Sequence, residues 1–146
     1  MKHSAIGSHC ILELHGCPYD ILDNEALVRN AIVAASQKSL STLLHLSSHR
    51  FEPQGVTAVG LLAESHISIH TWPERGYAAC DIFTCGAASR PTQACDFLAT
   101  TLRAANQSLQ VLARGQRPAP AASARLPRTA RNPSPPVQAE PQWAAN

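Results

Sequence analysis

Apolar and polar side chains alternate along three stretches of this chain, and such alternation is typical of strands with one buried face. The alternating stretches are residues 8–15, 66–72 and 77–84. Residues 41–51 and the nearly all-apolar run 56–63 predict two more strands, and a Glu-Pro-Gln-Gly turn separates them. A short apolar segment, residues 108–113, predicts the last strand.

Two further stretches predict helices. Residues 23–38 repeat small and apolar side chains at helical spacing, and Asp23 is the expected N-cap. Residues 91–105 begin with Pro91, a residue favoured in the first turn of a helix. The order β-α-β-β-β-β-α-β predicts an α+β fold: a two-layer sandwich whose antiparallel sheet carries two helices on one face. The other face of the sheet is then free for a partner or a site.

Composition divides the chain into one domain and a tail. Residues 1–113 are rich in Ala, Leu, Val, Ile and Ser, whereas residues 114–146 hold most of the prolines and many alanines. So little branched apolar surface cannot offset the entropy of ordering a chain. We therefore expect residues 114–146 to be a disordered tail. A core of about 113 residues is workable, and an oligomer would help it to bury more surface.

Charge and cysteine usage exclude several classes of protein. The tail carries five arginines and one acid, but the arginines are scattered among Pro and Ala with no aromatic residues interleaved between them, so we expect no nucleic-acid binding. No apolar run approaches the roughly 18 residues of a membrane span, and the first ten residues lack the apolar core of a signal peptide. Five cysteines without a CxxC pair then predict a cytoplasmic protein with reduced thiols.

The strand 66–72 carries unusual side chains on one face. With a period of two, His66, Ser68, His70 and Trp72 point to one side and the intervening isoleucines to the other. The two histidines lie about 13 Å apart along a strand, too far for one metal ion. The same spacing separates His45 from His49, also on a predicted strand. We therefore assign no metal, although pairing between strands leaves a site possible.

One cysteine differs from the others by its position. Cys10, Cys80 and Cys95 fit small buried apolar residues, whereas Cys85 ends a strand in a Thr-Cys-Gly turn, where a thiol can be reached. That position suits a nucleophile or a proton donor, so a Cys–His hydrolase is one possible function.

These residues also form a longer pattern. The run LLAESHISIHTWPERGYAACDIFTCG, residues 61–86, resembles the core of the small bacterial and archaeal S-adenosylmethionine decarboxylases. The segments HRFEPQGVTA, residues 49–58, and LDNEAL, residues 22–27, resemble the same family. The resemblance spans roughly residues 5–113 and excludes the tail.

The resemblance implies a precursor that cuts itself between Glu64 and Ser65. Ser65 attacks the carbonyl of Glu64, and elimination from the resulting ester yields a pyruvoyl group at the new N-terminus. Residues 1–64 become the β chain and residues 65–146 the α chain. His70 matches the family histidine that accepts a proton during processing.

The resemblance also implies how the mature enzyme acts on S-adenosylmethionine. The pyruvoyl carbonyl forms a Schiff base with the substrate amine and draws the electrons released with carbon dioxide, as other electron-sink cofactors do. Cys85 matches the proton donor, a role that suits a thiol because it is mostly protonated at neutral pH. Phe51 matches an aromatic that stacks on adenine, Glu74 matches a carboxylate that binds the ribose, and Trp72 is expected in the same wall.

The sequence departs from the family pattern at one position and leaves two alternatives. A serine that assists processing is replaced by Thr57, which keeps the hydroxyl, so we expect processing to survive. The family also implies a homodimer with sites built from both chains, and a product, decarboxylated S-adenosylmethionine, that donates aminopropyl groups in spermidine biosynthesis. The alternatives are a related pyruvoyl decarboxylase of ornithine or arginine, and a ferredoxin-like binding module without enzymatic activity.

Overall fold

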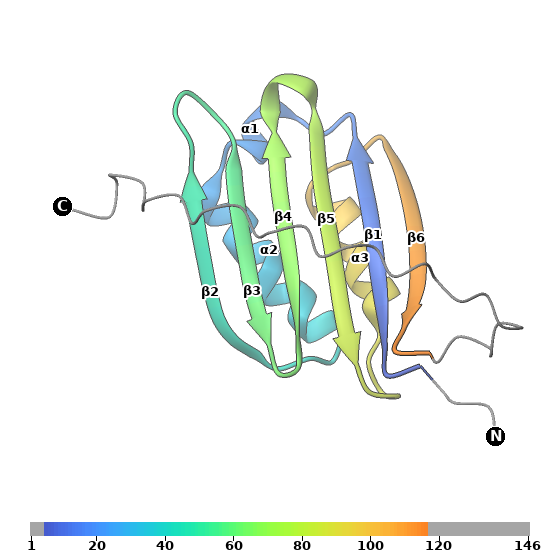
Figure 1. Cartoon of the computed structure of the whole chain (residues 1–146). Helices are drawn as coiled ribbons and strands as arrows, with labels where there is room; N and C mark the ends of the chain where they lie inside the picture. The colour runs from blue at the N-terminus through green and yellow to red at the C-terminus, as the bar shows by residue number, and fades with distance from the viewer. Residues whose placement is uncertain (1–4, 117–146) are drawn as a thin grey trace, which may run out of the picture.

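The computed structural model describes residues 5–116. Six strands form one sheet in which all neighbours are antiparallel, in the order β2-β3-β4-β5-β1-β6 (Figure 1). Their bounds are Gly7–His15 for β1, Leu43–Arg50 for β2, Val56–Leu62 for β3, Ser65–Trp72 for β4, Tyr77–Cys85 for β5 and Asn106–Arg114 for β6. The predicted order of strands and long helices is confirmed.

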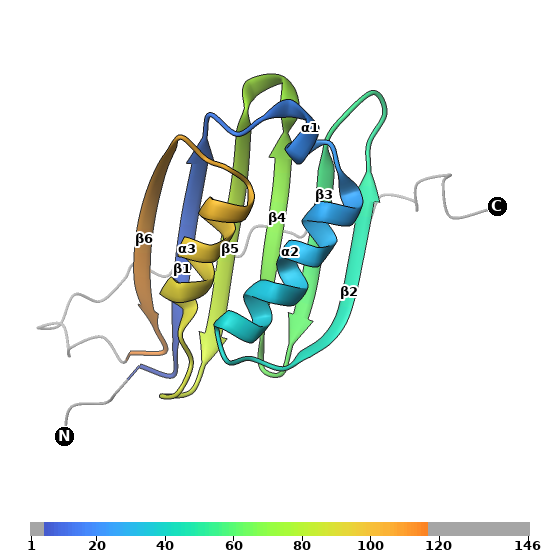
Figure 2. The ribbon, with the colours of Figure 1, turned by 180° about the vertical axis from the view of Figure 1, so that it is seen from behind.

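Two long helices cover one face of this sheet, and no helix of residues 5–116 covers the other, which we call the bare face (Figure 2). They are α2, Glu25–Lys38, and α3, Pro91–Thr101; the two short helices are α1, Tyr19–Leu22, and η1, Pro73–Arg75. The predicted α+β sandwich with two helices on one face is therefore confirmed, whereas sequence patterning did not predict the two short helices.

Two predicted helix ends are wrong. The N-cap of α2 is Asn24, whose side chain accepts a hydrogen bond from the Leu27 N–H, and not Asp23. The Asp23 carboxylate is instead engaged by Arg50 and by the backbone N–H of Gly55, far away in sequence. α3 ends at Thr101 instead of residue 105, and residues 102–105 connect it to β6, which begins at Asn106.

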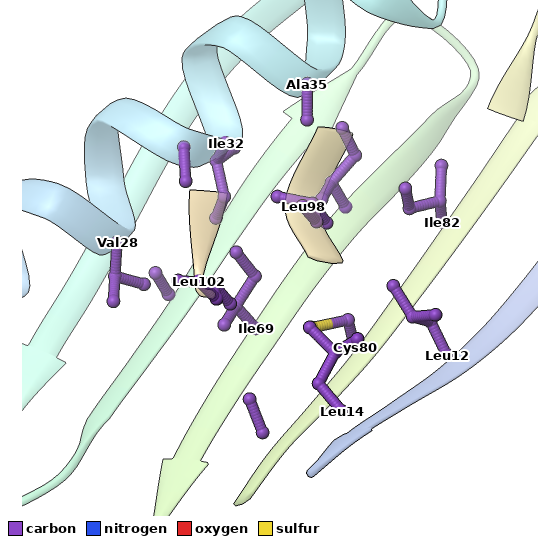
Figure 3. Close-up of a cluster of buried hydrophobic side chains, with 14 of the residues drawn as sticks. Leu12, Leu14, Val28, Ile32, Ala35, Ile69, Cys80, Ile82, Leu98 and Leu102 are labelled. Carbon is purple, nitrogen blue, oxygen red and sulfur yellow. The ribbon is translucent and has the colours of Figure 1, made fainter. Parts of the chain in front are cut away.

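The core lies between the sheet and the two long helices (Figure 3). Its large members are almost fully buried: Leu12, Leu14, Val28, Ile32, Ile69, Ile82, Leu98 and Leu102. Each such side chain contributes about 1.5–3 kcal/mol when buried. The approach of α2 to the sheet depends on Gly60, because a Cβ there would lie 2.6 Å from Ile32 Cγ2. The core thus fixes which face of each strand is bare.

The strands place two sets of connections at opposite ends of the sheet. The β3–β4 turn and the end of β5 lie at the lower edge in Figure 1, and the β2–β3 loop and the β4–β5 connection lie at the upper edge. Along β4, residues near Ser65 and residues near Trp72 are therefore far apart.

Two expectations concern the ends of the chain and membranes. Most of the predicted tail, residues 114–146, lies outside the described residues, although Arg114 itself ends β6. Among residues 5–116, no helix has the length and apolar character required to cross a membrane.

Candidate active site

The first group of predicted site residues lies at the β3–β4 turn. Ala63 and Glu64 connect the paired residues Leu62 and Ser65, and Glu64 has a φ of 71°. Side chains other than glycine rarely adopt this left-handed conformation, which costs about 1–3 kcal/mol. The Cys85 Sγ donates a hydrogen bond to the Glu64 carbonyl oxygen at 3.3 Å. We call Glu64, Ser65 and Cys85 the turn group.

The second group lies at the opposite edge of the sheet. Thr57 Oγ1 and His70 Nδ1 share a hydrogen bond of 3.0 Å across β3 and β4. These two residues line a hollow together with Phe51, Trp72 and Glu74. The residues Phe51 and Trp72 are 47% and 39% exposed. We call these five residues the loop group; their exposed aromatic faces and carboxylate can bind a flat, hydroxyl-bearing ligand.

Hydrogen bonds from Arg50 and Gly55 to Asp23 stabilise the loop that carries Phe51. The sequence predicted Asp23 as an N-cap and did not single out Arg50. Asp23 Oδ2 accepts a hydrogen bond from Arg50 Nη2 at 2.7 Å, and its Oδ1 accepts one from the Gly55 N–H at 3.0 Å. The hydrogen bond from Arg50, with that from Gly55, lowers the pKa of Asp23. The carboxylate thus connects both ends of the β2–β3 loop.

The two groups do not meet within one chain. His70 is five positions after Ser65 along β4, and at about 3.3 Å per residue their Cα atoms lie about 17 Å apart. A His70 imidazole cannot reach Ser65 across that distance. The sequence predicted the members of both groups, but one copy of the chain does not bring them together.

A third cluster on the bare face joins strands β1, β4 and β5, and β6 contributes through an arginine. Asp81 Oδ2 lies 2.7 Å from His9 Nε2 and 2.6 Å from His66 Nε2, and the Ser68 hydroxyl donates to Asp81 Oδ1. Arg114 Nη1 lies 2.8 Å from His9 Nδ1. We call these five residues the Asp81 cluster.

The strand pattern placed His66 and Ser68 on this face, but it missed the other members of the cluster. His9 is 72 residues from Asp81, so only the strand register brings them together. One signal was available: Asp81 is the only charged residue in the strand 77–84. Burial alone would raise the pKa of Asp81, but its hydrogen bonds outweigh that effect and lower it.

The prediction that Cys10, Cys80 and Cys95 are small buried apolar residues agrees with their burial. Cys10, Cys17, Cys80 and Cys95 are buried free thiols, whereas Cys85 is half-buried. Burial raises the pKa of each of the four buried thiols. Such thiols are poor nucleophiles, so Cys85 is the thiol best placed for chemistry.

Comparison with known proteins identifies the family. Residues 8–115 match the family model described as S-adenosylmethionine decarboxylase. The chain is 54% identical over 124 residues to the S-adenosylmethionine decarboxylase proenzyme of Synechococcus sp. (strain WH7803), covering 85% of this chain and 94% of that one. It is also 54% identical over 119 residues to the proenzyme of Prochlorococcus marinus (strain MIT 9313), covering 82% and 93%.

A solved structure agrees with both the fold and the family. The crystal structure of the adenosylmethionine decarboxylase from Aquifex aeolicus has a TM-score of 0.72 and 37% sequence identity, over 77% of this chain and 92% of that one. The similarity extends over nearly the whole length of these relatives. The chain therefore belongs to the S-adenosylmethionine decarboxylase family.

Proposed function

We propose that this chain is a self-processing decarboxylase of S-adenosylmethionine, cut between Glu64 and Ser65, whose sites are shared between two copies. The observation that carries the proposal is the contact between the Cys85 thiol and the Glu64 carbonyl oxygen, 3.3 Å apart, at a turn with a left-handed Glu64. Family membership indicates S-adenosylmethionine as the substrate, since the relatives are named for it.

The β3–β4 turn is suited to backbone cleavage. The Ser65 hydroxyl attacks the Glu64 carbonyl carbon, the peptide C–N bond breaks, and an ester replaces the amide. Removal of the proton on the Ser65 α-carbon then expels the Glu64 carboxylate. Water converts the resulting dehydroalanine to a pyruvoyl group and releases ammonia. The Cys85 S–H, already directed at the carbonyl oxygen, can stabilise the negative charge that develops there.

The residues at the start of β4 fit a pyruvoyl group at position 65. Ser65 is half-buried and begins β4, and the Cys85 thiol lies beside the adjoining carbonyl. The group supplies an electron sink for the loss of carbon dioxide. Cys85 then provides a proton to the substrate carbon from a position that the end of β5 fixes.

The loop group supplies the nucleoside side of the site. The exposed ring of Phe51 offers a flat face for the adenine, and the carboxylate of Glu74 can accept hydrogen bonds from the ribose hydroxyls. Trp72 stacks on Tyr77 with ring centroids 5.3 Å apart, which holds the indole in the wall of the hollow. An aromatic wall also attracts the sulfonium cation of the substrate.

Assembly of two copies would bring the turn group and the loop group together. If the bare faces of two sheets pack together with their strands reversed, the turn group of one copy meets the loop group of the other. Exposed apolar side chains on this face, such as Val59, Leu61 and Leu112, would be buried by that contact. His70 of one copy then serves Ser65 of the other, with Thr57 orienting its ring.

Intact-mass measurement of the purified protein tests the proposal. We expect fragments of residues 1–64 and 65–146, the second with a carbonyl in place of its amino terminus. A Ser65→Ala variant should remain whole and release no carbon dioxide from S-adenosylmethionine, while Ser68→Ala, a hydroxyl three residues further along β4, should still be cut. An uncut wild-type chain that decarboxylates the substrate would refute the proposal. Ornithine and arginine, assayed in parallel, should not be turned over.

A further inference from the structure

The Asp81 cluster occupies the bare face directly above the turn group. His66 follows Ser65 in sequence and pairs with Phe83, two residues before Cys85. The Phe83 ring lies 5.3 Å from the His9 ring and 6.2 Å from the His66 ring. The cluster is therefore attached to both strands that end at the site of cleavage.

The hydrogen-bond partners fix which atoms carry protons. An arginine N–H can only donate, so His9 Nδ1 accepts from Arg114 and carries no proton. His9 Nε2 therefore carries the ring proton and donates it to Asp81. His66 Nε2 and the Ser68 hydroxyl also donate to this carboxylate. The ionised Asp81 carboxylate thus accepts three hydrogen bonds, and together they hold the side chain in place.

A metal ion suits this arrangement less well, although the ligand atoms of His9, His66 and Asp81 lie within 4.8 Å of one another. Ligands bound at about 2 Å to one tetrahedral ion lie about 3.3 Å apart. Here each imidazole nitrogen lies 2.6–2.7 Å from the carboxylate oxygen, which is hydrogen-bond length. Arg114 also holds His9 in the tautomer whose Nε2 carries a proton and cannot bind a metal.

The Asp81 cluster joins residues of the two chains that cleavage would produce. His9 belongs to residues 1–64, and the other members belong to residues 65–146. Once the backbone is cut, residue 65 is a chain terminus, held in place by its strand pairing and by the side chains that follow it. Hydrogen bonds from His66 and Ser68 attach that terminal strand to β5, which carries Cys85.

We propose that Asp81 is a positioning residue for decarboxylation: by binding His66, Ser68 and His9 it holds the pyruvoyl-bearing end of β4 at the correct distance from Cys85. This inference rests on the proposed function. Asp81 is hydrogen-bonded to His9, His66 and Ser68 and acts through β4, the strand that follows the reacting group at residue 65. A displacement of about 1 Å at a reacting centre lowers rates about 100-fold.

Steady-state kinetics on the processed enzyme separate this role from a general loss of structure. Asp81→Asn keeps the shape of the side chain and removes the charge. We expect kcat to fall about 10- to 100-fold with little change in KM, because Asp81 is hydrogen-bonded to His9, His66 and Ser68 and to no member of the loop group that binds the nucleoside. Ser68→Ala removes one of the three donors and should lower kcat less. Asp96→Asn, the same substitution on the helical layer, is the matched control and should leave both constants unchanged.

A pair of substitutions at His66 distinguishes positioning from acid–base chemistry. His66→Gln keeps an N–H donor for Asp81, whereas His66→Leu has none. Positioning predicts that His66→Gln retains most of kcat, whereas His66→Leu, which removes one of the three donors as Ser68→Ala does, loses clearly more. Equal loss in both variants would show that the imidazole itself transfers protons and would overturn the inference.

These experiments distinguish failure of the positioning role of Asp81 from failure of the proposed function. Wild-type chain that is neither cut nor active refutes the proposed function; wild-type chain that is cut and active, with Asp81→Asn and Ser68→Ala equally active, refutes only the positioning role. If Asp81→Asn fails to fold, as judged by circular dichroism, Ser68→Ala and the His66 pair carry the test. Loss of wild-type activity with a chelator and its recovery with Zn²⁺ would also overturn the inference, since the cluster would then be a metal site.

Discussion

Replacing Thr57 with valine removes the hydroxyl that orients His70 and keeps the shape of the side chain. Thr57 Oγ1 and His70 Nδ1 lie 3.0 Å apart, and both residues are half-buried. A hydroxyl at this position fixes the rotation of the imidazole ring and determines which nitrogen faces the ester. Without it the ring can turn, so His70 presents its base to the other copy for a smaller fraction of the time.

The size of the effect follows from the strength of that hydrogen bond. A single neutral hydrogen bond in a half-buried setting contributes about 0.5–1.5 kcal/mol, and each 1.36 kcal/mol corresponds to a factor of ten in rate. We therefore expect Thr57→Val to slow self-cleavage about 2- to 13-fold. Thr57→Ser keeps the hydroxyl and should cleave at close to the wild-type rate.

Cleavage is followed by electrophoresis after a short pulse of cell-free synthesis, so that uncut chain is present at the start. His70→Ala is the reference for loss of the imidazole and should be slower than Thr57→Val. Cleavage of Thr57→Val at the wild-type rate would show that the hydroxyl does not assist His70. Equal slowing in Thr57→Ser and Thr57→Val would show that altered packing of the side chain, and not loss of the hydrogen bond, is responsible.

Three further outcomes are expected. Glu74→Gln should raise KM for S-adenosylmethionine with a smaller change in kcat, measured by carbon dioxide release, since an amide accepts the ribose hydrogen bonds more weakly than a carboxylate. Thr71→Val should lower the free energy of unfolding by about 2–4 kcal/mol, measured by urea denaturation of the uncut Ser65→Ala chain at fixed concentration, because it leaves a backbone N–H and a carbonyl without a partner. The hydrogen bond to Glu13 raises the pKa of Tyr77 to about 12; its stabilising contribution should be complete below about pH 10 and be lost as the pH rises toward 12, and ultraviolet titration should show a lower pKa in Glu13→Gln.

The sequence predicted the elements well because each strand and long helix has a local pattern of its own. Ile67 and Ile69 are fully buried under the helices, and His66 and Ser68 join Asp81 on the bare face, so the period-two prediction for this strand is confirmed. Asp23 failed as an N-cap because its carboxylate is bound from 27 residues away, by Arg50. Local propensity contains no information on such a competitor.

In the candidate site, too, local sequence predicted the residues but not their partners that are distant in sequence. Ser65, Cys85 and His70 were found from a contiguous motif, but their separation into two groups depends on the direction of β4 in the sheet. The contribution of His9 depends on the pairing of β1 with β5, which places His9 opposite Phe83 and brings it to Asp81, 72 residues away in sequence. Sequence periodicity predicts the face of a strand but not its neighbour, so the Asp81 cluster became visible only in three dimensions.

Co-production of two inactive variants tests the shared site most directly. Ser65→Ala cannot be cut but supplies His70, and His70→Ala supplies Ser65 without its base. We predict that His70→Ala chains remain whole alone and are cut when made together with Ser65→Ala chains, as read by intact mass with a distinguishing tag. If His70→Ala chains remain whole in the mixture while wild-type chains are cut, each site is contained within one chain and the account is contradicted.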